Sequence, residues 1–292
     1  MLNLHKMMID PYVDQLLVEF ELMYGTSEID YGEILRWVGH LALENLCNSD
    51  APYHNVEHTM TVAQVGQAIL KGKHLNEGGV KPYEWLHFMI ALLCHDIGYL
   101  RGICRGDKGD LAVIDEAGTL KEIPHEYTCA ALTPYHVDRG KVFVRERFTE
   151  TEHIDPELVA AHIEYTRFPP SEDAMNDTAS YGALVRCADL IGQLADPNYL
   201  RKIPALFYEF SELGLNEKFG YETPLQMRGK FAHFFWNSIS PYIQDGLRYL
   251  RVTQEGREWS ASLYAQVFTV EHTEDKGTSS IFPMLRPAKL PS

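Results

Sequence analysis

The stretch PYEWLHFMIALLCHDIGYLRG, residues 82–102, reads as a helix with one apolar stripe that ends in a His-Asp pair. Its apolar side chains recur at the spacing i, i+3, i+4, i+7 and i+8, which is typical of one buried helix face: Trp85, Phe88, Met89, Leu92 and Leu93. The next positions of this stripe are His95 and Asp96. A helix is therefore predicted over residues 82–99, with a carboxylate facing the core. Such a group is costly unless it is paired or bound to metal.

Helical periodicity dominates the rest of the chain, and alternating strand patterns are nearly absent. Further helices are predicted over residues 11–24, 31–47, 55–71, 126–136, 156–165, 178–195, 198–212, 224–250 and 254–268. Residues 100–124 and 273–292 are predicted as loops. The sequence thus predicts an all-α fold: N-terminal helices in residues 1–49 packed on a bundle over residues 50–250, followed by a C-terminal helix and loose tail in residues 251–292.

Charge and cysteine content limit the class of function. The chain has 26 Lys plus Arg against 41 Asp plus Glu, and a net charge of −15 repels nucleic-acid polymers. Its five cysteines are odd in number and contain no C-x-x-C pair, which favours a reducing compartment. Neither a long uncharged apolar stretch nor a signal peptide is recognised. We therefore expect a cytoplasmic protein without membrane or nucleic-acid partners.

Two further segments direct ligand-type side chains inward. In YHNVEHTMTVAQ, residues 53–64, His58 begins the apolar face of a helix and His54 lies one turn earlier. In YGALVRCADLIGQLAD, residues 181–196, Asp189 continues the apolar face. Imidazole and carboxylate groups are thus expected in the core on separate helices.

Four inward-facing groups on three apolar helices make up the candidate constellation: His58, His95, Asp96 and Asp189. Each one alone has a structural explanation, such as a hydrogen-bonded core histidine, a capping acid or a buried ion pair. Together they are typical of a divalent cation such as Zn, Mn, Fe or Mg. Because an aspartate can bridge two ions, two divalent metal ions are the predicted cofactors.

The motifs resemble a known superfamily. The His-Asp pair at 95–96, with an upstream histidine and a downstream aspartate, resembles the HD-domain metal-dependent phosphohydrolases, and the pattern is most similar to class I cyclic nucleotide phosphodiesterases. YHNVEHTMTV resembles their Y-H-N-x-x-H-x-x-D-V segment, and LVRCADLIG resembles their I-K-x-A-D-L/I-S-N-P segment. EYT at 164–166 and FYEF at 207–210 are weaker matches. The resemblance covers roughly residues 50–245.

The resemblance implies a function and roles for individual residues. The implied reaction is hydrolysis of a small phosphodiester, with a 3′,5′-cyclic nucleotide as the leading candidate, by hydroxide that the metals activate. The implied ligands of the tightly held metal are His58, His95, Asp96 and Asp189. His54 is implied as the general acid for the leaving oxygen. Glu126 falls near the acid that orients water, and Thr166 near the second metal. His125 is an alternative to Glu126, because other HD proteins place a ligand histidine at this point of the sequence.

Two departures from the family pattern concern the second metal and the substrate. Tyr99 stands where the H-D-x-x-H motif has its second histidine. Ten residues before Pro241, where the family has a purine-binding glutamine, this chain has Phe231. Tyr53, Phe231 and Phe234 are the predicted substrate-binding residues, although the last two fit a helix core equally well.

Two alternatives stay open. A di-iron oxygenase of HD type needs extra imidazole ligands, for which His125 and either His153 or His162 are candidates. A non-catalytic HD module would bind a ligand or partner without turnover. The predicted partner is a small-molecule phosphodiester, and a homodimer is an open alternative to a monomer.

Overall fold

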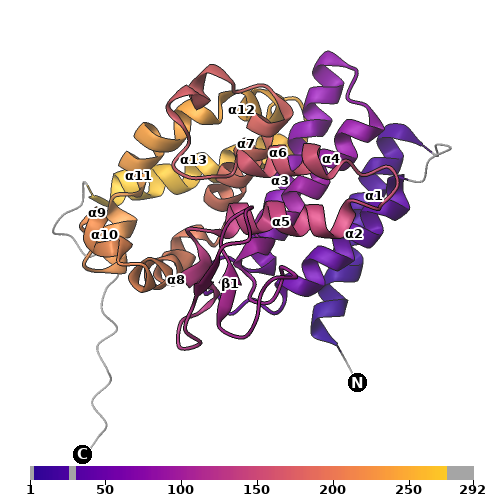
Figure 1. Ribbon diagram of the computed structural model, residues 1–292. Coiled ribbons are helices and arrows are strands. Elements are labelled where there is room, and N and C mark those ends of the chain that lie inside the picture. Colours follow the sequence, from indigo (N-terminus) through magenta and orange to yellow (C-terminus); the bar gives the residue numbers. More distant parts are fainter. Residues whose placement is uncertain (1–2, 26–30, 275–292) are drawn as a thin grey trace, which may run out of the picture.

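The computed structural model describes residues 3–25 and 31–274, and Figure 1 shows an almost wholly helical molecule. The helices are α1 Leu4–Tyr24, α2 Tyr31–Leu46, α3 Val56–Glu77, α4 Pro82–Cys94, α5 His136–Phe148, α6 Pro156–Glu164, α7 Tyr181–Ala195, α8 Tyr199–Glu212, α9 Leu215–Phe219, α10 Pro224–Gly229, α11 Phe231–Phe234, α12 Gln244–Leu250 and α13 Gln254–Glu274. Within the described ranges the only strands are β1 Leu111–Val113 and β2 Leu120–Glu122, which pair antiparallel. The predicted all-α fold is confirmed.

Helices α3, α4 and α7 meet at the centre of the molecule, and a glycine permits their close approach. A Cβ atom on Gly66 of α3 would lie 2.1 Å from Leu92 Cδ1 of α4 and 3.3 Å from the Ala188 Cβ of α7. Helix α4 is buried on every side from Trp85 to Cys94, which is more than the single stripe seen in the sequence. The three helices that carry the predicted ligands therefore form the middle of the core.

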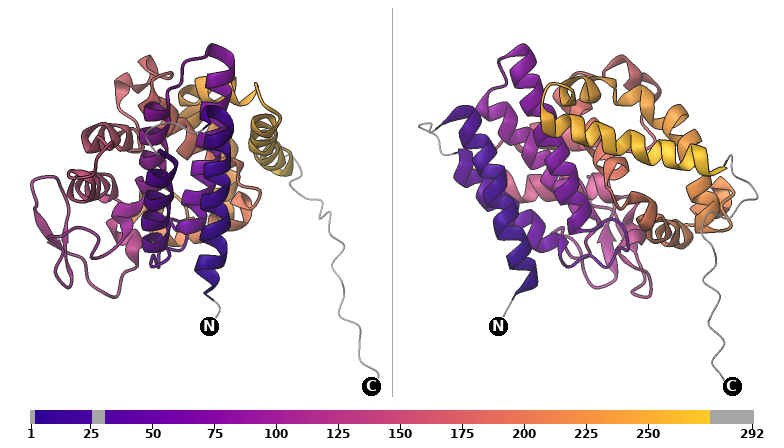
Figure 2. Two further views of the ribbon diagram at one scale, coloured as in Figure 1. Left: turned by 90° about the vertical axis from the view of Figure 1, so that its right-hand side faces the viewer. Right: turned by 180° about the vertical axis from the view of Figure 1, so that it is seen from behind.

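The terminal helices belong to the same core as the central helices. One cluster of buried apolar side chains runs from Ile9 in α1 to Val270 in α13. The Tyr12 hydroxyl donates to the Met60 carbonyl oxygen, and Gln67 Nε2 donates to the Leu16 carbonyl oxygen, so α1 is bonded to α3. Figure 2 shows α1 on the outside of the molecule in its left view. In its right view α13 runs across the side that faces the viewer. Helix α1 therefore packs directly against the central helices.

Several predicted helix boundaries were wrong. Helix α1 begins at Leu4 and continues through Pro11, because the Asn3 side chain caps its start by accepting from Lys6 N. The predicted helix over 224–250 is divided into α10, α11, a π-turn at Phe235–Ile239, a 3-10 turn at Ser240–Tyr242 and α12. Pro241 lacks the amide hydrogen that an uninterrupted helix would need there.

The predicted helix over 126–136 was also wrong, because only the 3-10 turn Cys129–Leu132 forms there and α5 starts where that helix was expected to end. Helix α5 escaped prediction because charged side chains occupy part of its inner face: Arg139 and Lys141 are both buried.

Arg139 holds in place the loop that follows the His-Asp pair, residues 98–113. This guanidinium has no exposed surface, and all five of its N–H groups find acceptors. Those acceptors are the carbonyl oxygens of Gly98, Leu100 and Val113 and both carboxylate oxygens of Asp107. The segment directly after the His-Asp pair is thereby tied to α5, together with the small hairpin.

A search of the described helices for membrane spans finds none that combines the necessary length and apolarity.

Candidate metal centre and adjoining cavity

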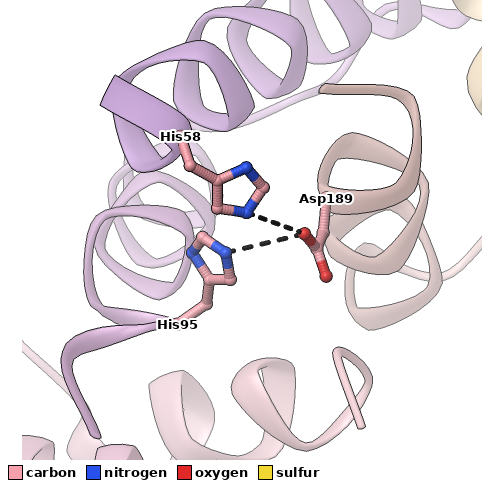
Figure 3. Close-up of side chains that lie close together, drawn as sticks. All are labelled: His58, His95 and Asp189. Carbon is pink, nitrogen blue, oxygen red and sulfur yellow. Dashed lines mark ion pairs between the residues drawn. The ribbon is translucent and has the colours of Figure 1, made fainter. Parts of the chain in front are cut away.

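Three of the predicted ligands converge from three different helices (Figure 3). His58 lies in the first turn of α3, His95 directly follows α4, and Asp189 lies in α7. Asp189 Oδ1 is 3.5 Å from His58 Nε2 and 3.6 Å from His95 Nε2. Residues up to 131 positions apart in the sequence, from 58 to 189, thus present one donor atom each to the same point.

Asp96 contacts the same two imidazoles, but it is not in the group of three residues whose donor atoms all lie within 4.8 Å of one another. Its Oδ2 atom lies 3.4 Å from His58 Nε2 and 3.3 Å from His95 Nε2. A tetrahedral site with bonds of about 2.0–2.2 Å places neighbouring donors about 3.3–3.6 Å apart. His95 Nε2 and Asp96 Oδ2 are also buried without a hydrogen-bond partner among the described residues. Spacing, donor types and unpartnered atoms all fit a divalent cation.

The tautomer of His95 suits a ligand. His95 Nδ1 lies 2.7 Å from the carbonyl oxygen of Leu92, and a carbonyl can only accept. Nδ1 therefore carries a proton, and in the neutral ring, the form that binds a metal, the lone pair of Nε2 is directed at the cluster. A backbone carbonyl commonly orients metal-binding histidines in this way.

Both carboxylates of the cluster are held in the anionic form. Burial raises the pKa of Asp189, but His58 and His95 outweigh this effect and lower the pKa to about 2. Burial likewise opposes ionisation of Asp96, and His95 followed by His58 lowers its pKa well below the usual range. Anionic carboxylates are the form that binds cations.

His136 joins the site, although the sequence analysis left it unassigned. Its Nδ1 lies 2.6 Å from the Thr133 carbonyl oxygen, so its free Nε2 faces Asp96 Oδ1 at 3.9 Å. Both carboxylate oxygens of Asp96 therefore face imidazole nitrogens: Oδ2 faces those of His58 and His95, and Oδ1 faces that of His136. No motif marks His136, because it begins α5, the helix that periodicity did not detect.

His54 pairs with a buried acid at the edge of the cluster. Its Nδ1 lies 2.5 Å from Glu209 Oε2, while Glu209 Oε1 accepts from the backbone N–H groups of Tyr53 and His54. Burial alone would lower the pKa of His54, but Glu209, with smaller contributions from Asp96 and Asp189, raises it to about 9. His54 is therefore a cation at neutral pH whose Nε2 remains available. Glu209 lies in the weakly matching FYEF segment and was not among the predicted site residues.

Tyr99 separates two of the imidazoles. Its ring stacks on His54 with centroids 4.7 Å apart and on His136 with centroids 4.5 Å apart. Tyr99 is 2% exposed, and burial raises the pKa of its hydroxyl, so the phenol stays neutral. Tyr99 thus fixes the planes of the two imidazole rings on either side of it.

A cavity of about 980 Å³ opens from this cluster. Predicted residues that line it are His54, Asp96, Tyr99, Thr166, Asp189, Phe231 and Phe234. Phe231 also packs in the core against Tyr199, with ring centroids 5.1 Å apart, so it belongs both to the core and to the cavity wall. Tyr53 is buried behind the histidines, with its ring centroid 5.2 Å from that of His54.

The structure does not bring His125 and Glu126 to the cluster. Both are exposed in the turn after β2, and His125 Nδ1 lies 3.4 Å from Asp110 Oδ2. The predicted roles came from the family resemblance, and the helix predicted over 126–136, which would begin at Glu126, does not form. His153 lies in a turn with positive φ, and His162 is buried on α6 beside Tyr181. None of these four described residues lines the cavity.

Comparison with known proteins gives a family but no curated relative. No curated protein matches the chain. A family model described as Npun_R2479-like matches residues 2–273, which include the candidate metal centre and the walls of the cavity. The chain therefore belongs to the Npun_R2479-like family.

Proposed function

We propose that this protein is a metal-dependent phosphodiesterase of HD type that hydrolyses a small phosphodiester. The observation that carries the proposal is the meeting of two imidazole nitrogens with two carboxylates at 3.3–3.6 Å, beside a protonated histidine at the end of a cavity. Cleavage of a phosphodiester with an alcohol leaving group uses both parts: positive charge at the phosphoryl oxygens and a proton for the leaving oxygen.

Four side chains hold the cation in this proposal: His58, His95, Asp96 and Asp189. A bound divalent cation supplies Lewis acidity at the phosphoryl oxygens and lowers the pKa of water. His136, which faces the second oxygen of Asp96, is the candidate ligand for a second ion. This assignment replaces His125 with a residue that lies at the site.

His54 is the proposed general acid. Glu209 keeps its Nδ1 occupied and favours the protonated imidazole, so Nε2 is the atom that delivers a proton to the leaving oxygen. Tyr99 holds the plane of the ring by stacking. A module without turnover would not require this pair, which favours an enzyme over a purely binding function.

An oxygenase with two irons is the second candidate, and His136 is the observation that favours it. The imidazoles first considered for that alternative, His125, His153 and His162, lie away from the cavity. His136 alone supplies an extra imidazole beside Asp96.

The test is a screen for activity with controlled metal content. Protein stripped with a chelator is reloaded separately with Mn, Mg, Zn or Fe and assayed on cyclic mono- and dinucleotides and on bis(p-nitrophenyl) phosphate. Metal-dependent release of a phosphomonoester is expected. Protein purified anaerobically with two irons that consumes oxygen, and hydrolyses none of these esters, would instead establish the oxygenase.

A further inference from the structure

The cavity extends well beyond the candidate metal centre. Its volume of about 980 Å³ is near the top of the range of about 300–1,000 Å³ for cavities that hold drug-sized ligands. His54, Asp96 and Asp189 line its polar end, and further lining comes from α5, from α7 to α11 and from the segments 166–170 and 237–242. In Figure 1 α9, α10 and α11 lie at the edge of the molecule away from α4. The cavity therefore has a charged end and a long second part.

The second part is mainly apolar. Its lining includes aliphatic and aromatic side chains from α7, α8 and the segment leading into α9: Leu190, Leu194, Leu206, Phe210, Leu213 and Leu215. Phe231 occupies the position at which the family resemblance predicts a base-binding glutamine. Apolar surface of this kind favours a hydrocarbon or aromatic group over a hydrated base.

Several polar side chains along this wall are already bonded to the protein. Asn237 Nδ2 donates to the His233 carbonyl oxygen at 2.8 Å. Lys230 Nζ donates to the carbonyl oxygens of Phe219 and Gly220. Arg167 is paired with Glu164 and Asp138. A site that recognises a base needs convergent polar groups with free hydrogen-bonding capacity. These three side chains have few donors left, while Gln193 and Ser238 also line the cavity.

We propose, on the basis of the phosphodiesterase function proposed above, that the substrate is an amphiphilic phosphodiester. Its phosphodiester group lies at the metal centre and its extended apolar group lies along the wall from Leu190 to Leu215. One water is consumed, a new P–O bond forms, and the bond from phosphorus to the leaving oxygen breaks. The leaving oxygen takes a proton, and the products are an alcohol and a phosphomonoester.

A series of p-nitrophenyl esters of methyl, butyl and octyl phosphate tests this substrate class on the metal-loaded protein. The leaving group is the same throughout, so the chemical step is matched and only the apolar group varies. KM is expected to fall by about two- to fourfold for each methylene that becomes buried. A KM that is constant across the series, with turnover present, would overturn the amphiphilic substrate and leave the phosphodiesterase function standing. A kcat/KM for cAMP above that for the octyl ester would also overturn the amphiphilic substrate and leave the phosphodiesterase function standing.

A pair of variants excludes non-specific adsorption of the alkyl chain. Leu215→Gln places an amide on the cavity wall, and the ratio of kcat/KM for the octyl ester to that for the methyl ester is expected to fall about tenfold. Leu225→Gln makes the same change on α10 at a side chain that is 76% exposed and does not line the cavity, so that ratio should stay constant. Equal ratios in both variants would contradict the proposed binding wall, provided that circular dichroism shows both to be folded.

Binding without turnover separates the two proposals. Methyl(octyl)phosphinate and dimethylphosphinate carry two P–C bonds and no P–O–C ester bond, so neither can be hydrolysed, and calorimetry on the metal-loaded protein measures their affinities. Tighter binding of the octyl compound, weakened by Leu215→Gln alone, supports the amphiphilic ligand even if no ester is hydrolysed, a result that would overturn the phosphodiesterase. Equal affinities, or no binding of either compound, would overturn the amphiphilic ligand.

Discussion

His54 depends on a single neighbour for its chemical state. Burial in an apolar surrounding disfavours an imidazolium, and the Glu209 carboxylate reverses that preference. Glu209 is 1% exposed and uses its other oxygen to hold the backbone of the YHN segment. One buried acid therefore sets both the position and the charge of the proposed general acid.

Replacing His54 with Ala should reduce activity in a manner that depends on the leaving group. We expect a loss of roughly 100- to 10,000-fold for a substrate that leaves as a sugar hydroxyl, which is the usual contribution of one acid–base group. The loss on bis(p-nitrophenyl) phosphate should be much smaller, because nitrophenolate leaves without a proton. Steady-state kinetics on both substrates, with metal analysis, provide the measurement.

Metal content should stay at the wild-type level in that variant, because His58 and not His54 belongs to the ligand set. Equal losses on both substrates with metal retained would refute the acid role. Loss of the metal would make His54 a ligand.

At the scale of elements, the loop after the His-Asp pair is positioned by α5. Arg139 bonds to both ends of the 98–113 segment, and Gly98 lies so close to α5 that a Cβ atom would be 1.9 Å from the His136 carbonyl oxygen. The same helix begins with His136. A disturbance of α5 should therefore reach the site as well as the stability of the fold.

Arg139→Met is expected to destabilise the protein by about 3–5 kcal/mol, because it leaves the buried Asp107 carboxylate without its cation. Urea denaturation measures the change in the free energy of unfolding. The same substitution at exposed Arg201 on α8 should change it by no more than about 0.5 kcal/mol. A loss at position 139 as small as that at position 201 would contradict the role of Arg139 as the tether of the loop.

The end of α6 provides a pH-dependent contribution to stability. Burial raises the pKa of Glu164, but Arg167 and Lys141 outweigh it and lower the pKa from the ordinary 4.5 to about 2. Because the folded-state pKa is the lower one, the contribution is fully present above pH 4.5 and is lost as the pH falls towards 2. Partial exposure of the pair keeps the contribution modest.

Glu164→Gln should therefore lower the free energy of unfolding at pH 6, and its difference from the wild type should shrink below pH 4.5. Urea midpoints measured from pH 3 to pH 7 provide the data. Glu21→Gln, at an exposed position of α1, is the control. A difference that is constant across this range would mean that Glu164 contributes by packing and not by charge.

At the scale of the whole molecule, the candidate metal centre joins α3, α4 and α7 at the middle of the core. A cation bound only by the folded state stabilises it by about 2.7 kcal/mol at a concentration 100 times its Kd. Thermal unfolding should therefore shift to higher temperature when the chelator-stripped protein receives Zn or Mn.

Asp96→Ala should abolish both that shift and the activity, because it removes a proposed ligand shared between two ion positions. The variant should not be more stable than the metal-loaded wild type, although it deletes a buried charge, since ligation offsets that charge. An Asp96→Ala protein with full metal occupancy and normal activity would contradict the assignment.

The sequence by itself determined the helical class and the four residues that meet at the centre. Both follow from local periodicity. A side chain that continues the apolar face of a helix faces the core, irrespective of the path of the connecting loops. Helix α4, which leads into His95, is strongly apolar, and α7, which bears Asp189, has one apolar face. Composition and motif spacing needed no tertiary contact to indicate these residues.

Only the tertiary structure decided the partners of those residues. Glu209 and His136 come to the site from α8 and α5, and nothing local distinguishes them from other acids and histidines. The positions predicted for His125 and Glu126 failed because the chain between α4 and α5 turns through a hairpin, whose path is set by Arg139 contacts distant in sequence. The shape of the cavity depended in the same way on the packing of short helices. Such long-range contacts are invisible to periodicity, because their energies depend on which segments meet and not on the pattern within any one of them.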